Sequence, residues 1–300
     1  MFRMRSLFLL LTSTLAALLL TAVPATAVPA RAAVTSVSAV SAASVGPRHY
    51  YLSIGDSLAF GLQLGELQAL IASGNYTPDA FNTGFTDDVA SMIRQRLRPD
   101  LAVVNYSCPV TGTAEMISTD PDACLFHSFG LALHDEWIGS QLGAAVAFLH
   151  AHPGQVSPIT VSVGGADISS AINDCSADFA CVARSGVFQK VRTNMTVIYN
   201  QLRAAAPDAD IVYLVPHNIT ITDFPGSNPS WSAFDLEMRA LAVAHRVKVA
   251  DAFAAITLAG RTCELTFMCL PPDQSDSHPN DAGYAVMAQL IIQAAHYNIR

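Results

Sequence analysis

Residues 50–58 read Tyr50-Tyr51-Leu52-Ser53-Ile54-Gly55-Asp56-Ser57-Leu58, an apolar run that ends in a Gly-Asp-Ser turn. Similar short runs, rich in β-branched residues, recur at 101–105, 159–163, 211–215 and 247–250. Between them lie segments with helical periodicity, at 86–98, 137–151, 185–206, 231–246 and 281–295. This alternation predicts parallel strands joined by helical crossovers. We therefore expect an α/β fold, a three-layer α/β/α sandwich around a five-stranded parallel sheet.

The loops that follow these strands carry the polar residues of greatest interest. The run Ile159-Thr160-Val161-Ser162-Val163 is typical of a strand covered on both faces, as in parallel sheets. In such sheets the functional loops gather at the carboxyl ends of the strands. Those loops contain Gly55-Asp56-Ser57, residues 105–112, Gly164-Gly165-Ala166-Asp167 and Pro216-His217-Asn218. We expect them to share one rim, with His278 folded back over it from the loop before the last helix.

The first 47 of the 300 residues differ in composition from the rest. Arg3 and Arg5 precede an apolar run from Leu7 to Leu20, which the small residues Ala25-Thr26-Ala27 follow. This order is typical of a secretory signal peptide, and an uncleaved membrane anchor is the less favoured interpretation. We expect a signal peptide over 1–27, a low-complexity spacer over 28–47 and one domain over 48–300. That domain contains no further apolar run of about 18 residues, so we expect no membrane span in it.

The charge of the chain argues against a nucleic-acid partner. It has 16 Lys and Arg residues against 24 Asp and Glu residues, a net charge of −8 with His neutral. Removal of Arg3 and Arg5 with the signal peptide leaves 14 basic residues and a net charge of −10. An acidic surface repels phosphate backbones.

The six cysteines predict disulfides rather than a metal site. All lie after the signal peptide, as Cys108, Cys124, Cys175, Cys181, Cys263 and Cys269. An even count after an export signal favours disulfides, although six cysteines permit 15 pairings. Because they fall as three close sequential pairs, we expect bridges 108–124, 175–181 and 263–269. No Cys-x-x-Cys occurs, so a zinc site is disfavoured.

Ser57 and His278 are candidates for a nucleophile and its base. Ser57 follows a strand at a point where a helix could begin, so its hydroxyl can be exposed while local amides face a developing oxyanion. A histidine and a carboxylate make such a hydroxyl nucleophilic at neutral pH. Taken alone, Gly-Asp-Ser is also an ordinary turn sequence.

The whole domain resembles the SGNH, or GDSL, hydrolase family of secreted serine esterases and lipases, whose sheet is flavodoxin-like. The resemblance rests on Gly55-Asp56-Ser57-Leu58 near one end and His278-Pro279-Asn280-Asp281-Ala282-Gly283-Tyr284 near the other. Three near-sequential disulfides resemble those of secreted actinobacterial members. The resemblance implies that Ser57 is the nucleophile, that His278 is the general base and that the Ser57 amide is one oxyanion donor. The Gly-x-Ser-x-Gly elbow of α/β-hydrolases is absent, since Ala59 holds its last position.

The carboxylate that orients His278 is open to three interpretations. The family commonly places Asp three residues before the histidine, but this position is Ser275. Asp276 lies two residues before His278 and Asp273 five residues before it. Either could fix the imidazole tautomer and stabilise its charged form. We favour Asp276, and a backbone carbonyl is the remaining alternative.

The oxyanion hole departs from the family pattern in two places. The family expects Gly-x-Asn-Asp after the third strand, whereas this chain has Ala166 in place of the asparagine. An ungapped match puts Val110 where the family has a glycine after the second strand, so Gly112 becomes a candidate donor. Asn218 and Asn173 are candidates to replace the missing amide. Asp167 is expected to hold its loop by accepting backbone amides.

These residues lead to a secreted, monomeric serine esterase or lipase as the expected function. Its partner would be a small-molecule or lipid ester, and we expect no metal or organic cofactor. One alternative is a lipid- or carbohydrate-binding relative with weak or no catalysis, which only Ala166 favours. A second alternative is an O-acetylesterase that acts on a polysaccharide.

Overall fold

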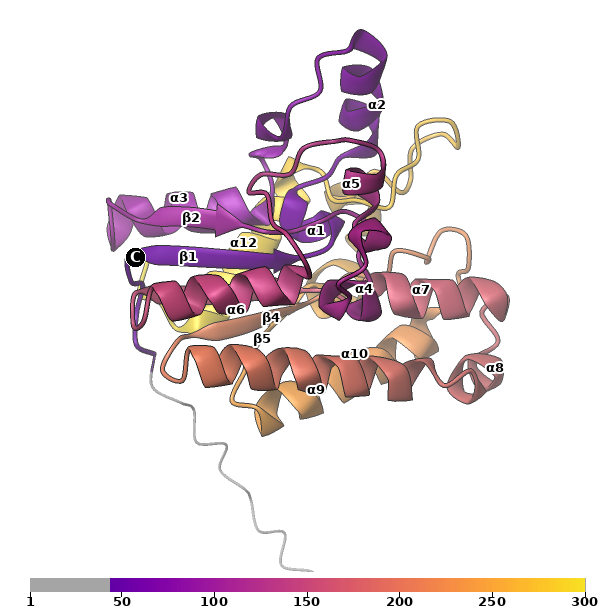
Figure 1. Cartoon of the computed structure of the whole chain (residues 1–300). Coiled ribbons are helices and arrows are strands. Elements are labelled where there is room, and N and C mark those ends of the chain that lie inside the picture. The colour runs from indigo at the N-terminus through magenta and orange to yellow at the C-terminus, as the bar shows by residue number, and fades with distance from the viewer. Residues whose placement is uncertain (1–43, 300) are drawn as a thin grey trace, which may run out of the picture. The chain divides into compact units, whose positions relative to one another are not determined.

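Five parallel strands form the centre of the protein in the order β2-β1-β3-β4-β5 (Figure 1). The computed structural model describes residues 44–299, so the predicted signal peptide and residues 28–43 of the predicted spacer lie outside the described residues. The strands are β1 (Tyr50–Gly55), β2 (Ala102–Asn105), β3 (Val156–Ser162), β4 (Ile211–Val215) and β5 (Lys248–Asp251). This is the strand order of flavodoxin-like folds.

Helices connect the strands and cover the sheet on both faces (Figure 1). They are α1 (Ser57–Phe60), α2 (Leu64–Ser73), α3 (Phe85–Arg96), α4 (Thr113–Ile117), α5 (Leu125–Ser128), α6 (Gln141–Ala151), α7 (Gly165–Asp174), α8 (Phe179–Arg184), α9 (Val187–Ala205), α10 (Asn228–Ala244), α11 (Thr262–Leu265) and α12 (Asp281–Ala295). Single turns of 3-10 or π helix occur at η1 (Pro78–Phe81), η2 (Pro121–Ala123) and η3 (Phe253–Leu258). The predicted α/β fold is confirmed, and each predicted strand and helix lies within four residues of its observed ends.

Alternation along the strands divides the core between the two faces. In β1, Leu52 and Ile54 pack with α6, α7, α9 and α10, whereas Tyr51 packs with α3 and α12. Helix α9 shows why such segments are helical, because its buried residues recur every three or four positions. Full burial of one such side chain stabilises the fold by roughly 1.5–3 kcal/mol. Both faces of the sheet are thus covered by buried apolar side chains.

A third apolar cluster covers the carboxyl ends of the strands on one side. It is built from α1, α2, η1, α5 and the loops beside them, and includes Phe60, Phe81 and Phe126. The disulfide between Cys108 and Cys124 lies inside it. The other two bridges, Cys175–Cys181 and Cys263–Cys269, complete the pairing that the spacing predicted.

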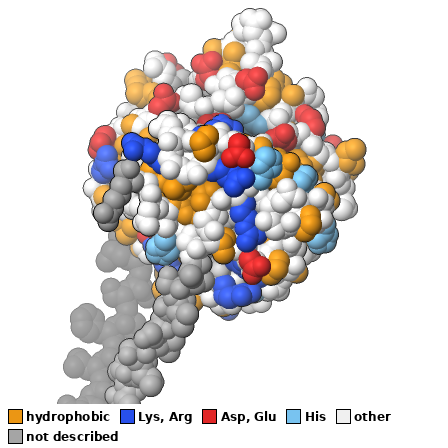
Figure 2. Space-filling view, turned by 90° about the vertical axis from the view of Figure 1, so that its left-hand side faces the viewer, with side chains coloured by type: hydrophobic (Ala, Val, Ile, Leu, Met, Phe, Trp, Pro, Cys, Tyr) orange, Lys and Arg blue, Asp and Glu red, His pale blue; other side chains and the backbone are white. Residues whose placement is uncertain are grey.

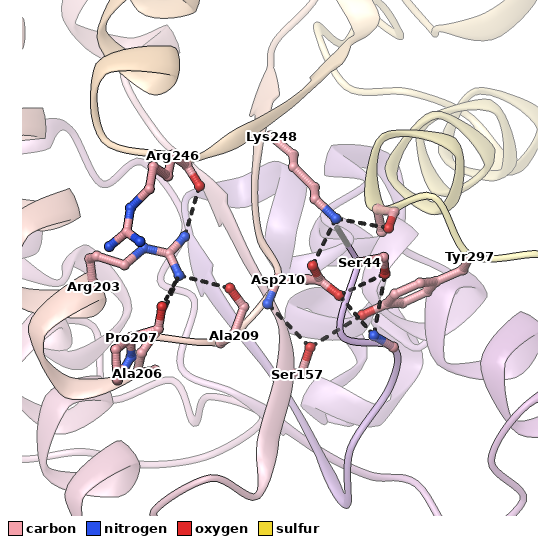
Figure 3. Close-up of polar contacts among 12 residues, drawn as sticks. Ser44, Ser157, Arg203, Ala206, Pro207, Ala209, Asp210, Arg246, Lys248 and Tyr297 are labelled. Carbon is pink, nitrogen blue, oxygen red and sulfur yellow. Dashed lines mark hydrogen bonds and ion pairs between the residues drawn. The ribbon is translucent and has the colours of Figure 1, made fainter. Parts of the chain in front are cut away.

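Cations gather at the opposite end of the sheet, where the strands begin (Figure 2). Helices end on this side of a parallel sheet, and their exposed carbonyls attract Lys and Arg. Arg203, in the last turn of α9, donates to the carbonyls of Pro207 and Ala209 beyond the end of α9 and to that of Arg246 beyond the end of α10 (Figure 3). Arg203 therefore caps helix ends, because each of its terminal guanidinium nitrogens donates to a backbone carbonyl.

The first described residues, from Ser44 onward, are held by hydrogen bonds at the end of the sheet where the strands begin. Ser44 Oγ and Gly46 N donate to Asp210 Oδ2, and Lys248 Nζ lies 2.7 Å from Asp210 Oδ1 (Figure 3). The last residues of the expected spacer are therefore part of the described fold. Within residues 44–299, no helix is both long and apolar enough to cross a membrane.

Candidate active site

The turn after β1 presents Ser57 at the first position of α1. Gly55 makes the turn possible: its φ is 155°, and a Cβ there would lie 2.2 Å from the carbonyl oxygen of Ser162. Asp56 then caps α1, because its Oδ1 accepts a hydrogen bond from the Leu58 amide. Ser57 consequently stands at a helix N-terminus, where backbone N–H groups have no intrahelical acceptor.

His278 reaches Ser57 from the loop before α12. Its Nε2 lies 2.8 Å from Ser57 Oγ, and its Nδ1 lies 2.5 Å from Asp276 Oδ1. Since a carboxylate only accepts, Nδ1 carries the proton and Nε2 is left to accept the serine hydroxyl. The structure thus brings together Ser57, His278 and Asp276, and leaves Asp273 exposed on the surface.

Asp276 is fixed by contacts on both carboxylate oxygens. Oδ1 also accepts the His278 backbone N–H at 3.1 Å, and Oδ2 accepts the Leu64 N–H at 2.7 Å. Burial raises the pKa of Asp276, but its hydrogen bonds and the neighbouring His278 charge outweigh this effect and lower the pKa overall. Asp276 is therefore ionised, as a residue that stabilises an imidazolium must be.

A second histidine, His217, contacts the loop that carries His278. His217, the second residue after β4, is fully buried, and its Nε2 donates to the Ser277 carbonyl at 2.8 Å. Its Nδ1 is buried and has no partner among the described residues. Burial lowers the pKa of His217 to about 4, so it stays neutral beside His278. His217 therefore helps to set the position of the loop without adding charge.

Ser57 and Val110 both line the space beside the serine hydroxyl. Within residues 44–299, neither the Ser57 N–H nor the Val110 N–H donates to a protein group. Val110 has a φ of 68°, a left-handed conformation that costs a β-branched residue roughly 1–3 kcal/mol. Such strain often marks a functional loop, and the disulfide at Cys108 holds this one in place.

The cavity beside Ser57 has a volume of about 160 Å³. Its wall combines the polar groups described above with small and apolar side chains from the loops after β1, β2, β3 and β4. The lining residues are Asp56, Ser57, Leu58, Val110, Gly165, Ala166, Pro216, Ile219, Ser277 and His278. No group of three or more His, Cys, Asp or Glu residues in the described part of the chain could hold a metal ion.

Comparison with known proteins assigns the family. The model of the GDSL-like lipase/acylhydrolase family matches residues 53–286, which is more than half of the chain. The chain belongs to this family. A comparison with curated proteins finds no match.

Solved structures share the GDSL hydrolase fold at low sequence identity. The acetylxylan esterase Axe2 from Geobacillus stearothermophilus is 14% identical, with a TM-score of 0.54 over 86% of this chain and 98% of that one. The lipase Lip_vut3 from a goat rumen metagenome is 17% identical, with a TM-score of 0.55 over 84% and 99%. LAE5, a hydrolase from the metagenome of Lake Arreo in Spain, is 16% identical, with a TM-score of 0.51 over 84% and 96%. At this level of identity the likeness establishes the fold.

The structure does not bring the predicted oxyanion residues together in the way that it brings together Ser57, His278 and Asp276. Val110, at the position of the GDSL family's glycine, lines the cavity in a glycine-like conformation. Gly112 lies outside the lining and caps α4, where a Cβ would be 2.5 Å from Glu115 Oε2. The structure thus places Val110, and not the predicted donor Gly112, at the cavity wall.

The structure brings the side-chain amide of neither predicted asparagine to the cavity wall. Asn218 is fully buried, and its Nδ2 donates to Ser227 Oγ and Asn228 Oδ1. Both amide hydrogens are thus used in holding the loop after β4. Asn173 is exposed near the end of α7 and does not line the cavity.

Asp167, the last residue of the family's Gly-x-Asn-Asp motif, has the structural role that the sequence predicts. Its Oδ2 accepts the Thr113 N–H at 2.8 Å, and its Oδ1 accepts the Thr113 hydroxyl at 3.1 Å. These bonds tie the start of α7 to the start of α4. Ala166 lines the cavity with a methyl side chain, which cannot donate a hydrogen bond.

Proposed function

We propose that this GDSL family member is a secreted serine esterase that cleaves carboxylic esters through an acyl-enzyme on Ser57. The observation that carries the proposal is the continuous line of hydrogen bonds from Ser57 Oγ through His278 to Asp276. Secretion is supported by the three disulfides, which are typical of oxidising compartments.

In the first half of the reaction, Ser57 Oγ attacks the ester carbonyl while His278 Nε2 takes the hydroxyl proton. The tetrahedral intermediate collapses when His278 returns this proton to the leaving alkoxide. Water then attacks the acyl-enzyme with the same histidine as base, and the acid leaves. Asp276 holds the ring tautomer and stabilises the imidazolium during both halves.

The carbonyl oxygen gains negative charge in each tetrahedral intermediate. We assign the Ser57 and Val110 amides as its donors, because both residues line the cavity, neither amide is otherwise used, and the two residues hold the positions of the family's serine and glycine. Losing one oxyanion donor costs about 10²–10³ in kcat in other hydrolases. The chain without the family's asparagine is thus expected to be a slower enzyme, not an inactive one.

The size of the cavity favours a short acyl group. A volume of about 160 Å³ is below the ~300 Å³ at which ligand pockets for drug-sized molecules begin. An acetyl or propionyl group fits, whereas a long acyl chain or a sugar must lie outside the mouth. An O-acetyl group on a polysaccharide meets this description, and one structural neighbour is an acetylxylan esterase.

The alternative is a binding protein that has kept the fold with little catalysis, which only Ala166 favours. Labelling with a fluorophosphonate, followed by intact-mass measurement, separates the two. A mass shift that is lost in Ser57→Ala and kept in the exposed control Ser73→Ala supports the esterase. Folded wild-type protein that stays unlabelled would support the binding protein.

A further inference from the structure

Asp56 is the one carboxyl group in the cavity wall that the proposed mechanism leaves without a role. It lies between Gly55 and Ser57 and is 6% exposed, and it lines the cavity together with Ala166. It therefore borders the side of the site from which the family's asparagine is missing. The inference that follows rests on the proposed esterase function.

The two oxygens of Asp56 have different surroundings. Oδ1 accepts two hydrogen bonds, from the Leu58 N–H and from the Ser162 hydroxyl, both at 3.1 Å. Oδ2 receives none from another residue within 44–299 and faces Gly165, at whose position a Cβ would lie 3.9 Å away. Oδ2 is also absent from the buried polar atoms that lack a partner, which fits an atom that reaches the cavity.

This asymmetry is compatible with a neutral carboxylic acid. Oδ1 behaves as the carbonyl oxygen, which accepts, and Oδ2 as the hydroxyl, which is free to donate. Burial raises the pKa of Asp56 to about 7, against the lowering effects of its hydrogen bonds and of His278. Near neutral pH a large fraction of the protein thus carries a proton on Asp56.

The tyrosines and polar residues that face Asp56 keep the same charge between pH 5 and 9. Tyr213 from β4 donates to the Val163 carbonyl and Tyr284 from α12 donates to the Leu62 carbonyl, and burial raises the pKa of both hydroxyls well above the usual value. From β3 and α6 the polar neighbours are uncharged: Ser162, and Gln141, which donates to the Gly55 carbonyl. His278, the base of the proposed reaction, also interacts with Asp56 and lowers its pKa.

We propose that Asp56 is a catalytic residue whose neutral carboxyl group donates from Oδ2 to the oxyanion, in the place of the amide missing at Ala166. No bond is made or broken at Asp56, and its proton stays on Oδ2 throughout. A carboxyl donor of this kind works only while protonated. Once ionised, it places a negative charge beside the oxyanion and opposes the reaction.

The test compares wild type with Asp56→Asn, using kcat on a short-chain nitrophenyl ester from pH 5.5 to 9. Asparagine keeps an oxygen for Leu58 and Ser162 and offers an N–H₂ that donates at any pH. We expect kcat of the variant within about threefold of wild type at pH 6 and at least tenfold above it at pH 9. A tenfold or greater loss at every pH in a folded variant would show that the ionised carboxylate is needed, and would overturn the proposal.

Two further variants keep the test decisive. Ala166→Asn restores a permanent donor while leaving Asp56 in place, so the decline of kcat at alkaline pH should become shallower; an unchanged decline counts against the proposal. Asp87→Asn is the matched control, because burial raises the pKa of Asp87 to about 6 although it lies in α3 and outside the cavity wall. Its pH profile should follow wild type.

A direct readout does not depend on turnover. The infrared difference spectrum of wild type minus Asp56→Asn should show a protonated-carboxyl C=O stretch at pH 6 that disappears by pH 9. If it is absent at pH 6, Asp56 is ionised and the proposal fails. Fluorophosphonate labelling of Ser57 in the same samples reports separately on the esterase assignment: an unlabelled wild type refutes that assignment, whereas a labelled wild type with the wrong pH profile refutes the role of Asp56 alone.

Discussion

Replacing Asp276 by asparagine should nearly abolish turnover, and the structure gives the reason. The two carboxylate oxygens accept three N–H groups, two from His278 and one from Leu64. Asparagine has one acceptor oxygen. If that oxygen faces His278, the new amide N–H₂ opposes the Leu64 N–H; if it faces Leu64, the N–H₂ opposes both donors of His278 and favours the wrong ring tautomer.

Both orientations therefore lose contacts and the charge that stabilises the imidazolium. An unsatisfied buried N–H costs roughly 1–3 kcal/mol, and loss of the carboxylate in a serine protease triad lowers kcat by about 10⁴. We expect kcat of Asp276→Asn to fall by about 10³–10⁴, which corresponds to ~4–5.5 kcal/mol of activation free energy.

The assay is kcat on a short-chain nitrophenyl ester near pH 7.5, with the midpoint of thermal unfolding measured alongside. Asp273→Asn is the control, because Asp273 is exposed in the same loop, five residues before His278. Its kcat should equal that of wild type. A loss of less than tenfold in a folded Asp276→Asn protein would refute the role assigned to Asp276, and a large loss in Asp273→Asn would move that role to Asp273.

Four further outcomes are expected. Ala166→Asn should raise kcat by up to about 10²–10³, most at alkaline pH; unchanged kcat at every pH would mean that the missing amide is already replaced or irrelevant. His217→Phe removes the bond to the Ser277 carbonyl and should lower kcat about tenfold at constant KM, with recovery in His217→Gln; equal kcat in all three proteins would exclude a positioning role. Because the pKa of Asp56 is raised from 3.8 to about 7, its favourable contribution to folding is complete below pH 3.8 and lost as pH rises through 7. Asp56→Asn should therefore unfold at a higher temperature than wild type at pH 9, with a gain on the order of 4 kcal/mol, and show no such gain at pH 4. Cys124→Ser opens a bridge between residues 16 apart and should destabilise the fold by about 2–5 kcal/mol in denaturant titrations; no change in the midpoint would mean that the loop is held without it.

The strands and long helices could be predicted because their signal is strong. Buried β-branched runs separated by amphipathic segments admit few folds. The order of the strands was implied only by the resemblance to a family with a flavodoxin-like sheet. Helix α7 was missed because Gly164, Gly165, Ser169 and Ser170 are weak helix formers. Tertiary contacts override this preference, through the burial of residues such as Ile168 in the core.

The parts of the site that need a particular side chain could be predicted from the sequence. The parts that use a backbone amide could not, because every residue except proline carries one. Ser57 and His278 are found because a nucleophile and its base need particular side chains. The role proposed for Val110 uses a backbone amide that any residue carries, so only its alignment with the family's glycine could have indicated it. Asn218 lies in a loop on the expected rim, but its Oδ1 accepts the Thr220 N–H in an Asx turn. The sequence Asn-x-Thr is compatible with such a local turn as well as with a role at the site, so the sequence could not distinguish the two.

The distance along the chain between Ser57 and His278, 221 residues, makes the chemistry a property of the finished fold. Closing a loop of that length costs on the order of 5 kcal/mol of chain entropy, which the completed sheet and the docking of α12 must offset. Under the function proposed above, a chain whose last helix has not yet docked still contains His278 but holds Ser57 without a positioned base. Reactivity of Ser57 toward a fluorophosphonate should therefore mark complete folding, so this probe can follow the refolding of the protein without an engineered reporter group.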